Sequence, residues 1–295
     1  MPAWIELLFD LAAVTALIAA ASTIESRSRR FLVLGLGLYA LQIAIRDGVF
    51  IVTNPFPNVV YRATAAVSVI LLGGAVWLWA RIVREPEDPS TGHVAKALIL
   101  FVIPVAAAHL HNAWMLSQFD LAPVLRLLLV GGAVILAFVG VSRSATSRWL
   151  PIGLGLYFLP SFSFRFADVV NRYGGYRSRE SFVISPPIVG AVLLASAVVV
   201  FLWGAGSREN RLRLAGLGLS LLLIPAVWNN VGYAIDCGAK TIHRCVPAFN
   251  PPPVVPLGLP DQSRSPRPPR GTPSSHVRRS TASRLDPPGR SLPTL

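Results

Sequence analysis

Residues 183–204 read VISPPIVGAVLLASAVVVFLWG, a run of 22 residues without a charged side chain. A helix needs about 20 mostly apolar residues to cross the hydrocarbon core of a bilayer, because each residue adds about 1.5 Å. This run is therefore long enough to span a membrane as an α-helix. An open sheet is excluded there, since its unpaired backbone groups would have no partner in lipid.

Seven further stretches have the same apolar character, so the chain is predicted to be an all-α, polytopic membrane protein. The eight predicted spans are residues 3–22, 31–53, 60–83, 94–117, 121–142, 149–170, 183–204 and 212–235. The first span is the weakest because it carries acidic residues, which leaves seven spans as the alternative count. We expect it to be a mature helix, because no basic segment precedes it as in a signal peptide.

Composition supports this class of protein. Of 295 residues, 53% are hydrophobic and only 14% are charged, whereas a soluble domain has about a quarter charged residues. The net charge is +13, but such apolarity argues against a soluble enzyme and against a nucleic-acid-binding module. Arginine supplies 25 of the 27 basic residues, which suggests a GC-rich genome and leads us to expect a bacterial inner membrane.

The distribution of basic residues predicts the orientation in the membrane. Loops after the first, third, fifth and seventh spans carry 11 positive charges, whereas the opposite side carries 6 close to the membrane. Because short cytoplasmic loops are enriched in Lys and Arg, both termini are predicted to be extracytoplasmic.

The last part of the chain, residues 237–295, is predicted to be a disordered extracytoplasmic tail after a transmembrane domain of residues 1–236. From Pro247 onward, 49 residues contain 13 of the 25 prolines and seven arginines, too few apolar groups to form a core. The tail is either inert or binds a protein partner. Cys237 and Cys245 are predicted to form a disulfide. A metal site that adds His243 is the alternative, but its ligand set is incomplete, so we expect no metal or cofactor.

The chain also contains matching segments in the same order. LGLGLY at residues 34–39 returns as IGLGLY at 152–157, an offset of 118. Trp79 matches Trp203 at 124, and Pro104 matches Pro225 at 121. We therefore predict two parallel four-helix repeats, residues 1–118 and 119–236, related by an axis along the membrane normal. The alternative is coincidence, since Gly and Leu are common in membrane helices.

Charged and amide side chains inside the spans are the candidates for a functional site, because such groups are costly in lipid. Counted from the predicted outer ends, most of them lie at a shared depth of about 5–12 Å. The candidates are Glu6, Asp10, Arg46, Asp47, His109, Arg126, Arg165, Asp168, Asn229 and Asn230. They predict a polar cavity that opens outward and binds a small solute, a lipid headgroup or a signal molecule. The alternative is a set of buried ion pairs that orient the helices.

The first functional hypothesis is therefore solute or signal binding, including transport, in a lipid bilayer and without nucleic acid. A second hypothesis is a membrane-embedded enzyme acting on lipid, with Asp10, Asp47 and His109 as acid and base. No zinc-protease, serine-hydrolase or phosphate-loop motif supports catalysis, so a non-enzyme is favoured. His109 and His111 project to different faces of one helix and cannot ligate one metal together. A scaffold or assembly protein is the third hypothesis.

Overall fold

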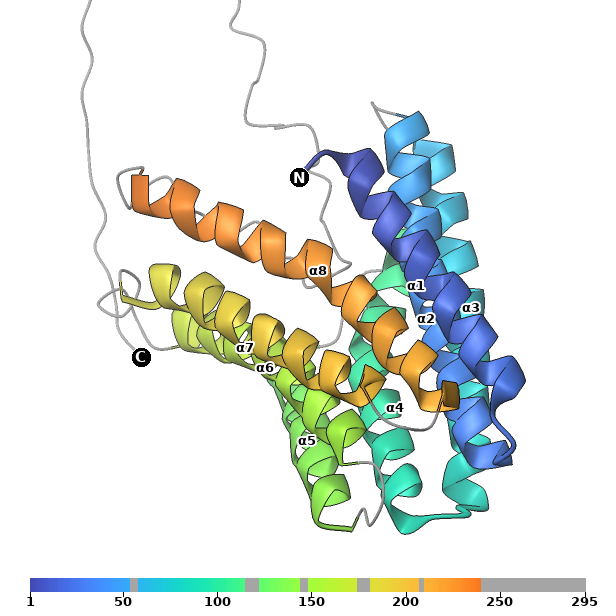
Figure 1. Cartoon of the computed structure of the whole chain (residues 1–295). Helices are drawn as coiled ribbons and strands as arrows, with labels where there is room; N and C mark the ends of the chain where they lie inside the picture. Colours follow the sequence, from blue (N-terminus) through green and yellow to red (C-terminus); the bar gives the residue numbers. More distant parts are fainter. Residues whose placement is uncertain (54–57, 115–121, 144–147, 174–180, 207–209, 240–295) are drawn as a thin grey trace, which may run out of the picture. The chain divides into compact units, whose positions relative to one another are not determined.

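The predicted all-α fold is confirmed, and each predicted span coincides with one helix (Figure 1). The computed structural model describes residues 1–53, 58–114, 122–143, 148–173, 181–206 and 210–239, and within these ranges it contains no strand. The helices are α1 (Ala3–Thr23), α2 (Arg27–Val52), α3 (Asn58–Arg84), α4 (Pro89–Trp114), α5 (Pro123–Arg143), α6 (Trp149–Tyr173), α7 (Ser181–Ala205) and α8 (Asn210–Ala239). The predicted ends agree with these bounds to within five residues.

The predicted tail lies almost entirely outside the described residues. Helix α8 extends to Ala239, three residues beyond the predicted end of the transmembrane domain. Cys237 therefore falls on the last turn of α8, but its side chain is not described, and Cys245 lies outside the described residues. The disulfide consequently stays a prediction.

Seven of the eight described helices are long and apolar enough to cross a membrane, and the exception is α6. The sequence pointed instead to the first span as the weakest. Helix α1 qualifies because Glu6 and Asp10 are its only charged residues. The second half of α6, in contrast, contains Arg165, Asp168 and Arg172. Helix α6 nevertheless takes part in the packing, and the set of helices is that of a polytopic membrane protein.

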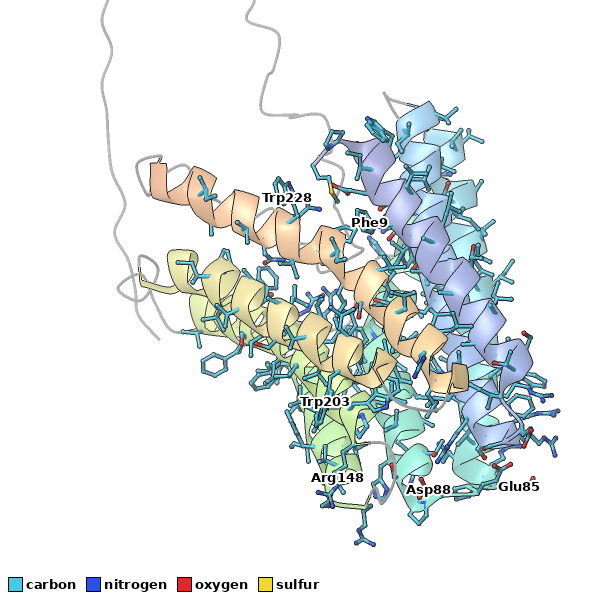
Figure 2. The ribbon with its side chains drawn as sticks, viewed as in Figure 1. Phe9, Glu85, Asp88, Arg148, Trp203 and Trp228 are labelled. Atoms are coloured by element: carbon cyan, nitrogen blue, oxygen red, sulfur yellow. The ribbon has the colours of Figure 1, made fainter. Side chains whose placement is uncertain are left out.

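The helices form a closed ring. Each packs against the next helix in the chain from α1 to α8, and α8 packs against α1 (Figure 1). Consecutive helices run in alternate directions, so the ring has two different ends. We call the end at which α1 and α3 begin the N-terminal end. We call the end at which they finish the basic end, where Figure 2 shows Asp88 and Arg148.

Aromatic side chains fill the ring at positions where glycine leaves room for them. Trp79 of α3 is completely buried, and its Nε1 donates a hydrogen bond to the Leu32 carbonyl at 3.2 Å. A Cβ on Gly35 of α2 would overlap the Trp79 indole. In the same way, a Cβ on Gly153 of α6 would overlap the ring of Phe201 from α7. Close helix approach, rather than a phosphate loop, therefore explains these glycines.

The packing of these aromatic residues gives Trp79 a different counterpart in the second half of the chain. The sequence paired Trp79 with Trp203, but Trp203 is 72% exposed. Phe201 is the residue that packs on Gly153 as Trp79 packs on Gly35, and its offset from Trp79 is 201 − 79 = 122. The two halves also have the same order of neighbours around the ring. The last helix of the first half, α4, packs against α5 of the second half, and the last helix of the second half, α8, packs against α1 of the first half. The duplication itself stays a prediction.

At the basic end, the carboxylate of Glu87 links the connection between α3 and α4 to the start of α2. Glu87, before α4, accepts hydrogen bonds from Ser26 Oγ at 2.6 Å and from the Ser28 backbone N–H at 3.3 Å. The Glu87 N–H in turn donates to Ser28 Oγ at 3.4 Å. Because these donors favour the ionised carboxylate, the Ser26 hydroxyl above all, the pKa of Glu87 is lowered.

Candidate functional site

Four charged side chains of α1 and α2 meet at the N-terminal end of the ring. Glu6 and Asp10 lie one turn apart on α1, and α1 packs against both α2 and α8. On α2, the guanidinium of Arg46 folds back onto Asp47, with Nε and Nη2 each 2.6 Å from the same oxygen, Oδ1. Asp10 lies beside this pair, within the electrostatic field of both Asp47 and Arg46. The four residues therefore form one electrostatic cluster.

Asp10 is the most deeply buried of these charged residues. Only 2% of its surface is exposed, whereas the side chains of Arg46 and Asp47 are 23% and 19% exposed. Its Oδ2 receives no hydrogen bond from any residue in the described part of the chain. A buried carboxylate oxygen without a donor is unusual, because most buried polar atoms are satisfied.

Helix α8 contributes to the cluster because it closes the ring against α1. The side chain of Asn229 hydrogen bonds the half-buried carboxylate of Glu6. The next residue, Asn230, is buried and faces a different neighbour, since a Cβ on Gly190 of α7 would lie 2.9 Å from its Oδ1. Its Nδ2 donates to the Ala226 carbonyl at 2.8 Å. Of the two asparagines, Asn229 therefore reaches the acidic residues.

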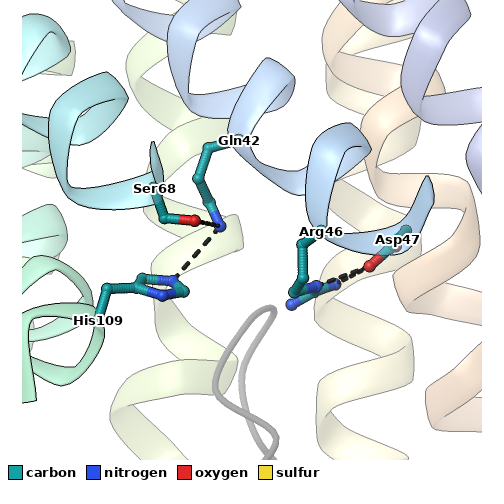
Figure 3. A network of polar contacts seen from close by, with 5 residues as sticks. All are labelled: Gln42, Arg46, Asp47, Ser68 and His109. Atoms are coloured by element: carbon teal, nitrogen blue, oxygen red, sulfur yellow. Dashed lines mark hydrogen bonds and ion pairs between the residues drawn. The ribbon is translucent and has the colours of Figure 1, made fainter. Parts of the chain in front are cut away.

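His109 of α4 enters the same region through a polar network that the sequence analysis missed (Figure 3). Its Nε2 lies 3.4 Å from Nε2 of Gln42, which also donates to Ser68 Oγ at 3.4 Å. Because an amide nitrogen only donates, the histidine nitrogen acts as the acceptor. Figure 3 shows the Arg46 guanidinium and the His109 ring turned toward one another.

Gln42 is completely buried, and its Oε1 has no hydrogen-bond partner among the described residues. The sequence offered one signal for it, since Gln42 precedes Arg46 by four residues and shares its face of α2. Uncharged amides and hydroxyls are common in membrane helices, so Gln42 and Ser68 did not stand out.

One turn closer to the middle of the ring, Tyr39 of α2 continues the same face. Its hydroxyl lies 2.8 Å from the hydroxyl of Tyr157 on α6, and both groups are buried. Tyr39, Gln42 and Arg46 thus form a polar stripe along about 10 Å of α2. We call this stripe, with its partners His109 and Tyr157, the polar column.

Beyond the tyrosine pair, toward the basic end, the centre of the ring is apolar. A cavity there is lined by leucine and aromatic side chains that include Leu36, Leu154 and Phe201. Its free space of about 20 Å³ would hold roughly one water molecule. The polar column is therefore followed by closely packed apolar side chains and not by a continuous polar passage.

The remaining predicted candidates lie on α5 and α6. Arg126, Arg165 and Asp168 are half-buried, and none of them is without a partner. The Arg165 guanidinium lies 6.0 Å from the ring centre of Phe164, its neighbour on α6. The described contacts thus bring together Glu6, Asp10, Arg46, Asp47, His109 and Asn229, from α1, α2, α4 and α8.

The two halves differ at the level of the network. The packing matches Gly35 with Gly153 and Trp79 with Phe201, and the sequence matches Pro104 with Pro225. At these three offsets Gln42 corresponds to Pro160, Ser68 to Gly190 and His109 to Asn230. This second set also lies together, because a Cβ on Gly190 would be 3.8 Å from Cβ of Pro160 and close to Asn230. Only the first half therefore places three polar side chains at this level.

Among the described residues, no three His, Cys, Asp or Glu side chains are close enough to hold a metal ion. Comparisons with protein-family models, with curated proteins and with solved structures find no match. The chemistry of the cluster is therefore derived from its own residues.

Proposed function

We propose that this integral membrane protein binds a small polar solute in the outer half of the membrane, at the N-terminal end of the ring. The observation that carries the proposal is the polar column together with the charged cluster of Glu6, Asp10, Arg46 and Asp47 beside it. Charged and polar groups of α1, α2, α4 and α8 thus converge at this end of the ring, where charges are costly in lipid unless they are paired. The proposal places the N-terminal end of the ring on the outer side, as the distribution of basic residues predicts. Both termini are then extracytoplasmic, and the basic end faces the cytoplasm of a bacterial cell.

Unsatisfied acceptors favour ligand binding over a purely structural role. Ion pairs that only hold helices together are stable when every polar atom has a partner. Here Oδ2 of Asp10, Oε1 of Gln42 and Oδ1 of Asn230 have no donor in the described part of the chain. Each unsatisfied buried acceptor costs about 1–3 kcal/mol, so a solute that donates to such an acceptor would bind favourably.

Transport is the finer form of this proposal. Pro104 interrupts the backbone hydrogen bonds of α4 five residues before His109, and Pro225 does the same in α8 five residues before Asn230. These positions allow α4 and α8 to bend beside the site. Acid–base catalysis has weaker support, because Nε2 of His109 contacts an amide and the described contacts pair it with neither Asp10 nor Asp47.

Accessibility of Gln42 from outside tests the proposed function. We would replace Cys237 and Cys245 by Ser, introduce Gln42→Cys, and label right-side-out vesicles with a membrane-impermeant thiol reagent. The control is Leu36→Cys, which lies on the same helix beyond the tyrosine pair and lines the apolar cavity. We expect Cys at position 42 to react at least about tenfold faster, because thiol reaction requires water and access. Equal, slow reaction at both positions would refute an outward-facing site.

A further inference from the structure

We infer that the solute carries a primary ammonium group and that Asp10 is the residue that binds it. This inference deepens the proposed function and rests on it. It names a class of solute, a small amine, where the cluster alone would admit a cation, an anion or a neutral molecule.

The balance of charges excludes an anion as the preferred ligand. The cluster contains three carboxyl groups, from Glu6, Asp10 and Asp47, but its one guanidinium, from Arg46, is already bound to Asp47 by two nitrogens. His109 contributes an acceptor nitrogen to Gln42 and not a second cation. The N-terminal ammonium also acts on Glu6, so three carboxyl groups face two permanent cations, one of which is bound to Asp47. In a membrane such carboxylates favour binding of a cation.

The unpartnered oxygen of Asp10 specifies what kind of cation fits. Oδ2 of Asp10 is an acceptor without a donor among the described residues, and Asp10 is almost completely buried. A primary ammonium has three N–H donors and no acceptor, which complements this arrangement. A quaternary ammonium has the charge but no N–H donor, so it would leave Oδ2 of Asp10 unsatisfied.

Two features argue for an organic cation and for a small one. The described residues hold no group of three close ligands for a metal ion, so a metal would lack its coordination shell. The buried Tyr39–Tyr157 pair and the apolar side chains behind it end the polar column. The solute therefore places its ammonium at Asp10 and the rest of its body toward the N-terminal end of the ring.

Thermal unfolding of the purified full chain in phosphatidylcholine nanodiscs tests this inference. The probes are methylamine, ethanolamine and, as the donor-free control, tetramethylammonium, each compared with potassium chloride at equal ionic strength. Because a ligand that binds only the folded state stabilises it, the two primary amines should raise Tm in a saturable way up to about 100 mM. Tetramethylammonium should not.

Three variants identify the residue. Asp10→Asn should abolish the amine-dependent rise in Tm, and Asp88→Asn at the basic end should retain it. If Asp10→Asn does not fold, Glu6→Gln serves instead, because Glu6 is half-buried and glutamine keeps the hydrogen bond to Asn229. Removal of this nearby charge should weaken amine binding about fivefold.

The outcomes separate this inference from the proposed function. An equal rise with tetramethylammonium, an unchanged rise in Asp10→Asn, or a Tm that responds to pH and to no amine would overturn the ammonium assignment. If position 42 is accessible from outside while no amine binds, the outward site stands and only the solute class is wrong. If position 42 is inaccessible as well, both proposals fail.

Discussion

The hydroxyl oxygens of Tyr39 and Tyr157 lie 2.8 Å apart in the centre of the helix ring, although 118 residues separate them in the chain. This contact joins α2 to α6, which are not neighbours around the ring. It also lies where the polar column ends and the apolar cavity begins. One phenol donates this hydrogen bond and the other accepts it, so the contact links two buried hydroxyls across the interior.

The first prediction concerns this pair. Tyr39→Phe leaves the buried hydroxyl of Tyr157 without its partner, so it should lower the free energy of unfolding by about 1–2 kcal/mol. Tyr39→Phe combined with Tyr157→Phe removes both hydroxyls and should cost less than the sum of the single changes. Unfolding of the single and double variants in mixed micelles measures this coupling. Strict additivity would show that the hydroxyl contact contributes no stability.

A second prediction tests the close packing at glycine. Gly35→Ala should destabilise the protein by about 1–3 kcal/mol, because the new methyl group would overlap the Trp79 indole. Gly37→Ala is the matched control, two residues later on the same helix, where a Cβ would make ordinary contacts with Leu17 and Ile18 at 3.8 Å. Thermal unfolding should show Gly37→Ala to be neutral or stabilising. Equal effects of the two changes would contradict the packing described.

The third prediction distinguishes the two tryptophans that the sequence matched. Trp79→Ala should cost about 3–5 kcal/mol, because the side chain is completely buried. Trp203→Ala should cost less than about 0.5 kcal/mol, since 72% of Trp203 is exposed. Phe201→Ala should resemble Trp79→Ala. A large loss of stability for Trp203→Ala instead would restore the pairing expected from the sequence.

The fourth prediction follows from the lowered pKa of Glu87 at the basic end. A carboxylate whose pKa is lower in the folded state stabilises the fold above its unfolded value of 4.5, and the contribution disappears as pH falls through the folded value. Stability of the wild type should therefore decrease below about pH 4.5 more steeply than that of Glu87→Gln. The effect is small because Glu87 is exposed.

Unfolding midpoints measured between neutral and acid pH check this dependence on Glu87. Ser26→Ala serves as a second variant, because it removes the hydroxyl that contributes most to the lowered pKa. It should reduce the pH dependence as Glu87→Gln does. An identical pH profile in all three proteins would show that this carboxylate is not linked to folding.

The fifth prediction separates folding from binding at Arg46. Arg46→Gln leaves the half-buried Asp47 carboxylate unpaired and should destabilise the protein by about 1–3 kcal/mol. Arg46→Gln with Asp47→Asn removes both charges and should recover most of that stability. If the pair serves only the fold, the double variant should bind solute as the wild type does. We expect it to bind more weakly, because the charge pattern around Asp10 has changed.

Much of the architecture could be predicted from the sequence because it depends on local properties. Apolar length alone placed all eight helices, and the cost of charge in lipid selected Glu6, Asp10, Arg46 and Asp47 as candidates. Gln42 and Ser68 escaped notice because an uncharged polar residue is ordinary in such a helix. Tyr39 and Tyr157 occupy matching positions in the repeated segment, but the order of residues along the chain does not show that their hydroxyls are in contact.

The sequence by itself thus determined that the chain is a set of long apolar helices, as in a polytopic membrane protein, since hydrophobicity and helix rise are properties of each segment alone. Only the tertiary structure decided that α8 closes the ring against α1, that Phe201 and not Trp203 takes the place of Trp79, and that Asp10 lies beside the Arg46–Asp47 pair. These relationships depend on which helix faces pack together. In lipid that choice follows from shape and from the satisfaction of polar atoms, because apolar side chains are equally well accommodated by lipid and by another helix.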